Sequence, residues 1–215
     1  MQLIGKRLGR NPRLSSQLFR LATCPALFST LDDGKIVKGL AGVPDEGPVL
    51  FTGYHTLMGL EIYSLVEEFL KENIMVRGVA HPDLFSENFE DLAAEFSVSD
   101  WMKVMGAVPV IESSLRDESK GEVASTDLFI PGLLPKVPGR FYFLFGKPIK
   151  TKGMKDMLED KENESQLYLH VKSEVQNSIA YLLKKREEDP YRSIIDRTIY
   201  RAFNSPLPGV PAFDP

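Results

Sequence analysis

A histidine between an apolar run and a patterned helix is the residue in this sequence best placed to do chemistry. His55 follows the apolar residues Val49 to Phe51 and a short turn at Thr52 and Gly53. In α/β proteins, the point where a strand gives way to a helix commonly carries reactive side chains. The positive end of the helix dipole disfavours imidazolium, so a neutral His55 could accept a proton from a hydroxyl group. The alternative is a histidine that only caps or packs against the turn.

The helix predicted over about residues 57–72 offers His55 an acidic partner. The residues predicted to form its buried face are Met58, Ile62, Leu65, Val66 and Phe69. Glu61 falls on a different, polar face of the same helix. A carboxylate hydrogen-bonded to imidazole would fix its tautomer and raise its basicity, so Glu61 is a candidate catalytic partner. The alternative is that Glu61 is one charge on a solvated face.

A second histidine ends the next predicted strand. Residues 74–80 are apolar and β-branched, and His81-Pro82 follows them. We expect the strand at Val49, the helix and this strand to form a right-handed crossover with parallel strands. His55 and His81 would then share the carboxyl edge of the sheet, which makes His81 a candidate substrate contact. The alternative is a surface histidine at the end of a strand.

Two basic residues flank a further predicted strand, residues 140–145. Arg140 begins this apolar strand, and Lys147 follows it in the sequence Gly-Lys-Pro-Ile. Either cation could hold a headgroup phosphate or the phosphate of a phosphopantetheine. The alternative is that both are solvated charges beside a buried strand.

Several sequence blocks resemble a known acyltransferase family. Gly53-Tyr54-His55 followed by Gly59 resembles the Gly-Tyr-His-Pro-His-Gly motif of the diacylglycerol acyltransferase family. From about Leu27 to about Tyr191, the chain resembles more closely the acyltransferase half of the chloroplast phytyl ester synthases. Besides the His55 stretch, the blocks that carry this resemblance are residues 28–35, 76–82, 101–110 and 131–140.

This resemblance implies a fold, an activity and a location. The fold would be α/β, a glycerolipid-acyltransferase-like mixed sheet flanked by helices. The activity would be transfer of a fatty acyl group from acyl-CoA, acyl-carrier protein or a galactolipid to phytol or diacylglycerol, without metal or other cofactor. The expected partners are lipid substrates, acyl-carrier protein and a membrane or lipid-droplet surface, at a chloroplast plastoglobule or thylakoid.

The resemblance also suggests roles for individual residues. His55 would be the base and Glu61 its partner. The residues that would contact substrate are Tyr54, Gly59, His81, Arg140 and Lys147.

The chain departs from the family pattern after about Val110. In the family, the preceding block leads into a Pro-Gly-Gly element and further strands, but no Pro-Gly-Gly occurs here. We therefore expect an internal deletion near residues 110–112 that shortens the central part of the sheet. The alternative function is a catalytically inactive, shortened protein that binds lipid or a membrane surface.

Charge and composition argue against several functions and kinds of site for this chain. The 26 basic and 30 acidic residues are unevenly distributed, because no acidic residue precedes Asp32 while the first 31 residues include Lys6, Arg7, Arg10, Arg13 and Arg20. Such a start resembles a transit peptide or a basic surface segment. The acidic remainder argues against nucleic-acid binding. The single cysteine excludes an intrachain disulfide, and the three histidines make a structural zinc site unexpected.

We divide the chain into a basic segment (1–26), an acyltransferase-like domain (27–192) and a C-terminal tail (193–215). Residues 14–27 have the spacing of an amphipathic helix, either an interfacial anchor or a helix packed on the domain. Residues 164–187 are predicted to be a long helix ended by Pro190, with His170 on its surface. Residues 205–215 contain four prolines and are expected to form a loose tail.

Overall fold

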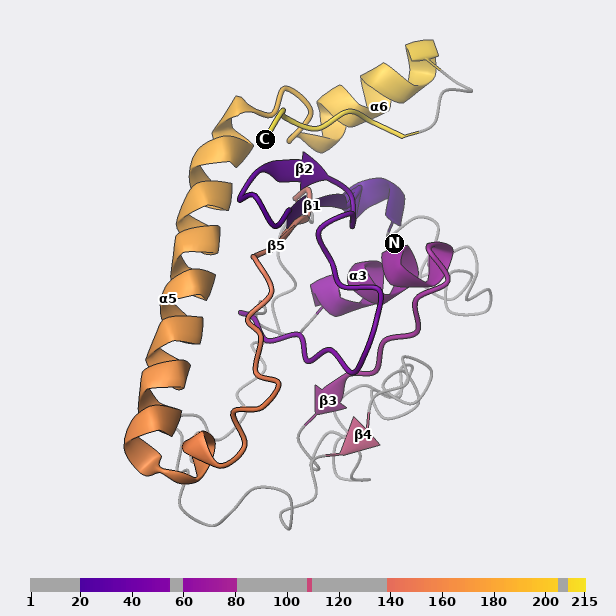
Figure 1. The fold of residues 1–215 in the computed structure, drawn as a ribbon. Coiled ribbons are helices and arrows are strands. Elements are labelled where there is room, and N and C mark those ends of the chain that lie inside the picture. The colour runs from indigo at the N-terminus through magenta and orange to yellow at the C-terminus, as the bar shows by residue number, and fades with distance from the viewer. Residues whose placement is uncertain (1–19, 55–59, 81–107, 110–138, 205–208) are drawn as a thin grey trace, which may run out of the picture. The chain divides into compact units, whose positions relative to one another are not determined.

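The computed structural model describes residues 20–54, 60–80, 108–109, 139–204 and 209–215. They show the α/β architecture expected from the sequence, in two compact units (Figure 1). The sheet unit comprises Arg20–His55 and Val137–Pro215, and the α3 unit comprises Met1–Phe19 and Thr56–Lys136.

The sheet unit is built on three strands, β1 (Ala26–Thr30), β2 (Ile36–Lys38) and β5 (Tyr142–Phe145), in the order β2-β1-β5. β1 pairs antiparallel with β2 and parallel with β5, so the sheet is mixed as expected. Phe28 lies opposite Lys38 on one side and Leu144 on the other. β5 lies inside the strand predicted over residues 140–145 and confirms it.

The helix expected over residues 14–27 overlaps the first two residues of β1, so this central strand was not predicted. Among the described residues it continues only from Arg20 to Thr23. Cys24 then adopts a positive φ of 40°, and its N–H bonds to the carbonyl of Arg20 at 2.8 Å, which caps the last turn. Pro25 has no N–H to continue the helix. Ala26 can therefore start a strand.

The connection that follows β2 returns close to the end of β1. The N–H of Gly42 bonds to the hydroxyl of Ser29 at 2.9 Å. A Cβ atom on Gly42 would lie 2.3 Å from the carbonyl oxygen of Thr30. Only glycine allows this close approach.

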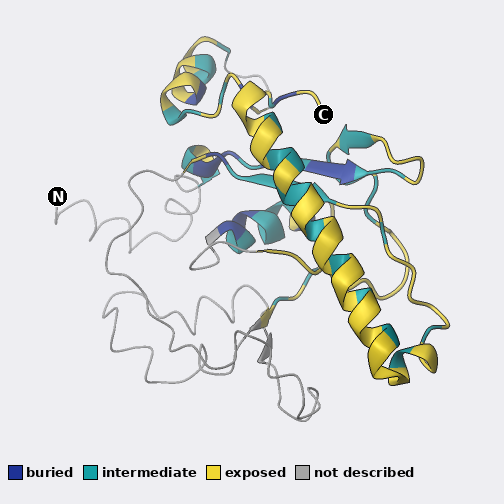
Figure 2. Ribbon diagram, turned by 90° about the vertical axis from the view of Figure 1, so that its left-hand side faces the viewer, coloured by how far each residue is buried: buried dark blue, intermediate teal, exposed yellow. Residues whose placement is uncertain are grey.

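The long helix α5 (Lys161–Lys185) confirms the helix predicted over residues 164–187, and a 3-10 turn (Arg186–Glu188) extends it. One side of the helix is half-buried and the rest is exposed (Figure 2). The half-buried side includes the predicted stripe, which consists of Leu167, Val171, Val175, Ile179 and Leu182. His170 is exposed, as predicted.

The C-terminal residues are part of the core, so the prediction of a loose tail is wrong for residues 209–215. Phe213 is buried and stacks on Phe28, with ring centroids 4.4 Å apart, and on Tyr142 at 5.7 Å. Ala26 completes this buried cluster, and Leu182 of α5 packs against it. Aromatic rings bury so much apolar area that one phenylalanine can hold a short proline-containing segment in place. The helix α6 (Ile194–Asn204) precedes the segment and was also not predicted.

The α3 unit contains α3 (Leu60–Lys71), β3 (Val79–Ala80) and β4 (Val108–Pro109). β3 and β4 pair in parallel over two residues, and β3 confirms a short strand within the predicted range 74–80. Phe69 is buried in α3, as predicted.

The crossover expected over residues 49–80 does not form as predicted, because one of its two strands is absent. Residues 49–51 form no strand and are exposed, and β3 pairs with β4. Apolar composition favours a strand only where a neighbouring strand can accept its backbone hydrogen bonds.

Candidate functional site

The carboxyl ends of β1 and β5 define one edge of the sheet, because the two strands are parallel. Thr30 at the end of β1 donates its hydroxyl hydrogen bond to the carbonyl of Phe145 at the end of β5, at 3.0 Å. Beyond β5, Lys147 donates from Nζ to the carbonyl of Asp32 at 2.7 Å. Open α/β sheets bind ligands at this edge. We call it the carboxyl edge.

The residues just before His55 reach the carboxyl edge through an aromatic contact. The rings of Phe51 and Phe145 meet edge to face, with centroids 5.7 Å apart. Leu50 and Tyr54 are each 80% exposed. The chain therefore leads to His55 along an apolar, exposed segment, residues 49–54, beside the ends of β1 and β5. His55, Gly59 and His81 themselves lie outside the described residues.

Lys147 is exposed, which agrees with the alternative that it is a solvated charge. Its hydrogen bond to Asp32 also anchors it to the turn after β1. Among the predicted substrate contacts, Lys147 and Tyr54 are the two that the structure describes on the exposed surface of the sheet unit. A role in binding substrate stays a prediction for both.

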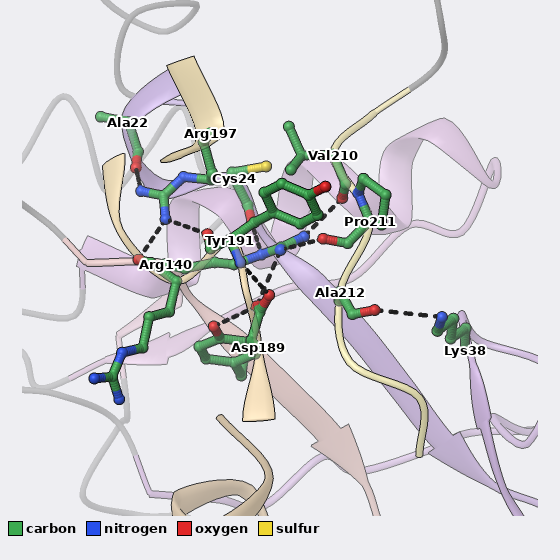
Figure 3. Close-up of polar contacts among 12 residues, drawn as sticks. Ala22, Cys24, Lys38, Arg140, Asp189, Tyr191, Arg197, Val210, Pro211 and Ala212 are labelled. Atoms are coloured by element: carbon green, nitrogen blue, oxygen red, sulfur yellow. Dashed lines mark hydrogen bonds and ion pairs between the residues drawn. The ribbon is translucent and has the colours of Figure 1, made fainter. Parts of the chain in front are cut away.

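Arg140 lies at the opposite end of β5 from Lys147, so the two cations do not share a site. Its side chain is only 2% exposed. Nε donates to the carbonyl of Cys24 at 3.0 Å and Nη1 to the carboxylate of Asp189 at 3.0 Å (Figure 3). The remaining contacts are to the carbonyls of Val210 and Pro211.

The alternative of a solvated charge is therefore wrong for Arg140. Its guanidinium joins the start of β1, the residue after α5 and the C-terminal segment. A phosphate at this position would have to displace these internal contacts.

The carboxylate of Asp189 is shared by further donors. The hydroxyl of Tyr142 donates to Oδ2 at 2.6 Å, and the N–H of Tyr191 donates to Oδ1 at 2.8 Å. Burial, together with the hydrogen bond and negative charge of Asp189, raises the pKa of Tyr142 well above its ordinary value. At neutral pH the phenol of Tyr142 is therefore protonated and donates its hydrogen bond to the carboxylate of Asp189.

A second buried arginine, Arg197, ties α6 to the start of the sheet unit. It donates to the carbonyls of Tyr191 at 3.0 Å, Arg192 at 2.6 Å and Ala22 at 2.6 Å (Figure 3). Burial lowers the pKa of its guanidinium, and its Nε is buried without a hydrogen-bond partner. No local sequence pattern singles out Arg197, because an arginine in an amphipathic helix is usually a surface charge.

Glu61 is buried in the first turn of α3, and Ser64 one turn later is fully buried. The alternative that Glu61 belongs to a solvated face is therefore wrong. A buried carboxylate needs a hydrogen-bonding or charged neighbour. The pairing of Glu61 with His55 stays a prediction, because His55 lies outside the described residues.

Two features are absent from the part of the chain that the structure describes. No group of three or more histidine, cysteine, aspartate or glutamate side chains there is arranged to bind a metal ion. No described helix is both long enough and apolar enough to cross a membrane.

Comparison with known proteins finds two relatives in Arabidopsis thaliana. The chain is 41% identical to phytyl ester synthase 1, chloroplastic, over 289 residues, which cover 91% of this chain and 41% of the relative. It is 31% identical to phytyl ester synthase 2, chloroplastic, over 283 residues, which cover 89% of this chain and 40% of that relative. No family model and no solved structure matches the chain.

The lengths of these alignments show how much of each relative the chain covers and that the chain lacks part of the aligned region. The chain spans about two fifths of each relative's length. Both alignments are also longer than the 215 residues of the chain itself, so part of each aligned region has no counterpart here. Such a gap is what the predicted internal deletion requires, and its position near residues 110–112 stays a prediction. Over about nine tenths of its length, this chain thus resembles the chloroplast phytyl ester synthases.

Proposed function

We propose that this chain transfers a fatty acyl group to phytol in the chloroplast, at a plastoglobule or thylakoid surface. The observation that carries the proposal is the 41% identity to a phytyl ester synthase over 91% of the chain. Diacylglycerol is a second acceptor to test, because the His55 stretch resembles the motif of diacylglycerol acyltransferases.

The reaction needs a base, an acyl donor and a lipid alcohol. His55 would take the proton from the hydroxyl as its oxygen attacks the acyl carbonyl. The carbon–sulfur bond of an acyl-CoA or acyl-carrier-protein donor, or the ester bond of a galactolipid donor, then breaks. The proton passes to the leaving group, and neither a covalent enzyme intermediate nor a cofactor is required. Glu61 would orient the imidazole.

The exposed apolar residues before His55 support binding of a lipid acceptor. Leu50, Phe51 and Tyr54 present apolar surface at the carboxyl edge immediately ahead of the proposed base. An isoprenoid or acyl chain binds through burial of such surface. Gly59, His81 and Lys147 would complete the contacts with substrate.

The test is transfer of labelled acyl groups to phytol and, separately, to diacylglycerol by the purified chain. We expect His55→Ala to lower the rate about 100-fold or more without changing the circular dichroism spectrum. We expect Leu50→Ser and Tyr54→Ser to raise KM for the acceptor. Tyr168→Ser, at an exposed tyrosine of α5, is the matched control and should leave KM unchanged.

The second candidate function is an inactive, lipid-binding protein. It is favoured by the gap in both alignments, because the absent region could contain parts that catalysis needs. A folded chain that binds phytol or acyl lipid equally with and without His55, and transfers no acyl group, would establish this function and exclude the first.

A further inference from the structure

A shallow hollow of about 320 Å³ lies between α6 and the turn that precedes it. Its walls include three aromatic side chains, Tyr191, Tyr200 and Phe203, and the carboxylate of Asp196. Asp196, Tyr200 and Phe203 are spaced by four and then three residues, so they follow one side of the helix. Tyr191 completes the wall from the turn before α6. All four residues belong to the sheet unit, so the hollow is formed within one unit.

The two tyrosines form a corner of the hollow. Their ring centroids lie 4.8 Å apart, and the planes of the rings are inclined at 63° to each other. Inclined rings offer two walls to a bound group, whereas a flat stack would offer one. Both tyrosines are half-buried, and Phe203, which is 84% exposed, lies at the rim. The face of an aromatic ring carries partial negative charge and attracts a cation within about 6 Å.

The negative charge of Asp196 is not neutralised by any residue that the structure describes. Its carboxylate is exposed and has no hydrogen bond or ion pair among them. The cations nearest to it in the sequence are engaged elsewhere. Arg192 pairs with Glu187, and Arg197 donates to three backbone carbonyls (Figure 3). The hollow therefore combines aromatic rings with a carboxylate, and both attract a cation.

The lining suits a cation that needs no hydrogen bonds. Asn204, also in the wall, donates from its side-chain amide to the carbonyl of Tyr200 at 2.8 Å. The wall offers few acceptors besides the carboxylate of Asp196. A primary ammonium or a guanidinium would lose hydrogen bonds to water without enough acceptors in exchange. A quaternary ammonium has no N–H groups, and its methyl groups spread the charge over a surface that packs against aromatic rings.

We propose that this hollow binds a quaternary ammonium group, the charged group of choline. Its methyl groups lie against Tyr191, Tyr200 and Phe203, and the carboxylate of Asp196 balances its charge. Soluble choline and the headgroup of a choline lipid share this chemistry, and the experiments separate the two sources. Binding requires no acyl transfer, so this proposal does not rest on the proposed function.

The first experiment is an NMR titration of the full chain, with isotope-labelled tyrosine rings, at constant ionic strength. Tetramethylammonium should cause saturable shifts in the ring signals of Tyr191 and Tyr200. Tyr168 is the internal control and should not shift, because its exposed ring already has the Nζ of Lys172 at 5.9 Å from its centroid.

Comparison of ligands on the wild-type chain tests the charge and the methyl groups separately. Dimethylbutanol has the shape of choline with carbon in place of nitrogen, so it keeps the apolar contacts and loses the charge. Methylammonium keeps the charge and adds N–H groups. We expect each to bind at least about threefold more weakly than choline. This comparison needs no substitution in the protein.

Substitutions test the individual walls. Asp196→Asn should weaken choline binding about threefold, and Tyr191→Leu combined with Tyr200→Leu about tenfold, as measured from the methyl signal of the ligand. Glu174→Gln and Tyr168→Leu, both on the exposed side of α5, are the matched controls and should leave Kd unchanged. Circular dichroism shows whether each variant is folded.

Vesicles of phosphatidylcholine identify the source of the group. Cosedimentation that tetramethylammonium displaces would assign the headgroup of a choline lipid. Binding of choline without cosedimentation would assign a soluble ligand. Either result supports the site.

Three results would overturn the proposal. The first is the absence of saturable shifts with tetramethylammonium and choline. The second is equal binding of dimethylbutanol or methylammonium, which would make the hollow a simple apolar or a general cation site. The third is choline binding that is unchanged both in Asp196→Asn and in the folded double tyrosine variant.

Discussion

The carboxylate of Asp189 and the guanidinium of Arg140 form an ion pair of 3.0 Å, buried on both sides and formed across 49 residues of chain. The same guanidinium holds Cys24 before β1 and Val210 in the C-terminal segment. One arginine thus fixes the start of the sheet, the end of α5 and the last residues of the chain. A phosphate-binding role, suggested by its place beside an apolar strand, would compete with this structural one.

Replacing Arg140 by methionine should destabilise the sheet unit by about 3–5 kcal/mol, because Asp189 would be left buried without its cation. Urea unfolding followed by circular dichroism measures this loss. Lys147→Met is the matched control, since Lys147 is exposed and makes one hydrogen bond to a carbonyl. Equal stability of the two variants would contradict the structural role of Arg140.

Tyr142→Phe should change how stability depends on alkaline pH. The pKa of Tyr142 is raised in the folded protein, so its stabilising effect is complete below its ordinary value of 10.0 and declines as the pH rises above it. At pH 7, loss of the hydrogen bond to Asp189 should cost about 1–3 kcal/mol. Between about pH 8 and about pH 11, the wild type should lose up to about 1 kcal/mol more than the variant, allowing for solvent at this half-buried site.

The measurement is urea unfolding of wild type and variant at each pH. Tyr168→Phe, on the exposed side of α5, controls for general effects of tyrosine ionisation. A constant difference between wild type and Tyr142→Phe across this range would show that the phenol does not titrate as its contacts require.

Phe213→Ala should cost about 3–5 kcal/mol, because it removes a ring stacked on Phe28 and Tyr142 within the core. Phe203→Ala removes the same side chain from a position that is 84% exposed and should change stability little. Thermal unfolding of the two variants compares them directly. A tail that does not contribute to the core would make both variants as stable as the wild type.

Gly42→Ala should destabilise the sheet unit by about 1–3 kcal/mol, since its Cβ would overlap the carbonyl oxygen of Thr30 unless the backbone moves. Gly53→Ala has no atom within 4 Å of the new Cβ and provides the matched control. Chemical denaturation of both variants tests the contact. If the two substitutions cost the same, the connection after β2 is free to relax around an alanine.

Local patterns were sufficient for several elements. The stripe of α5 repeats over many turns, so its helical period and its half-buried side follow from residues close together in the chain. β5 is a short apolar run that ends before Gly146, and it appears where predicted. The resemblance of the blocks around His55 and β5 likewise needed no coordinates, and the comparisons confirm it.

Other features depend on residues far apart in the chain, and no local pattern could reveal them. The run at Val49 has the composition of a strand but no partner strand, whereas β1 forms because β2 and β5 bond to both of its edges. Arg140 and Arg197 resemble surface charges until distant carbonyls and Asp189 surround them. Phe213 belongs to the core only because Phe28 and Tyr142 come to lie beneath it. Hydrophobic burial and ion pairing act through space, so partners that are remote in the sequence determine whether a residue is buried, paired or exposed.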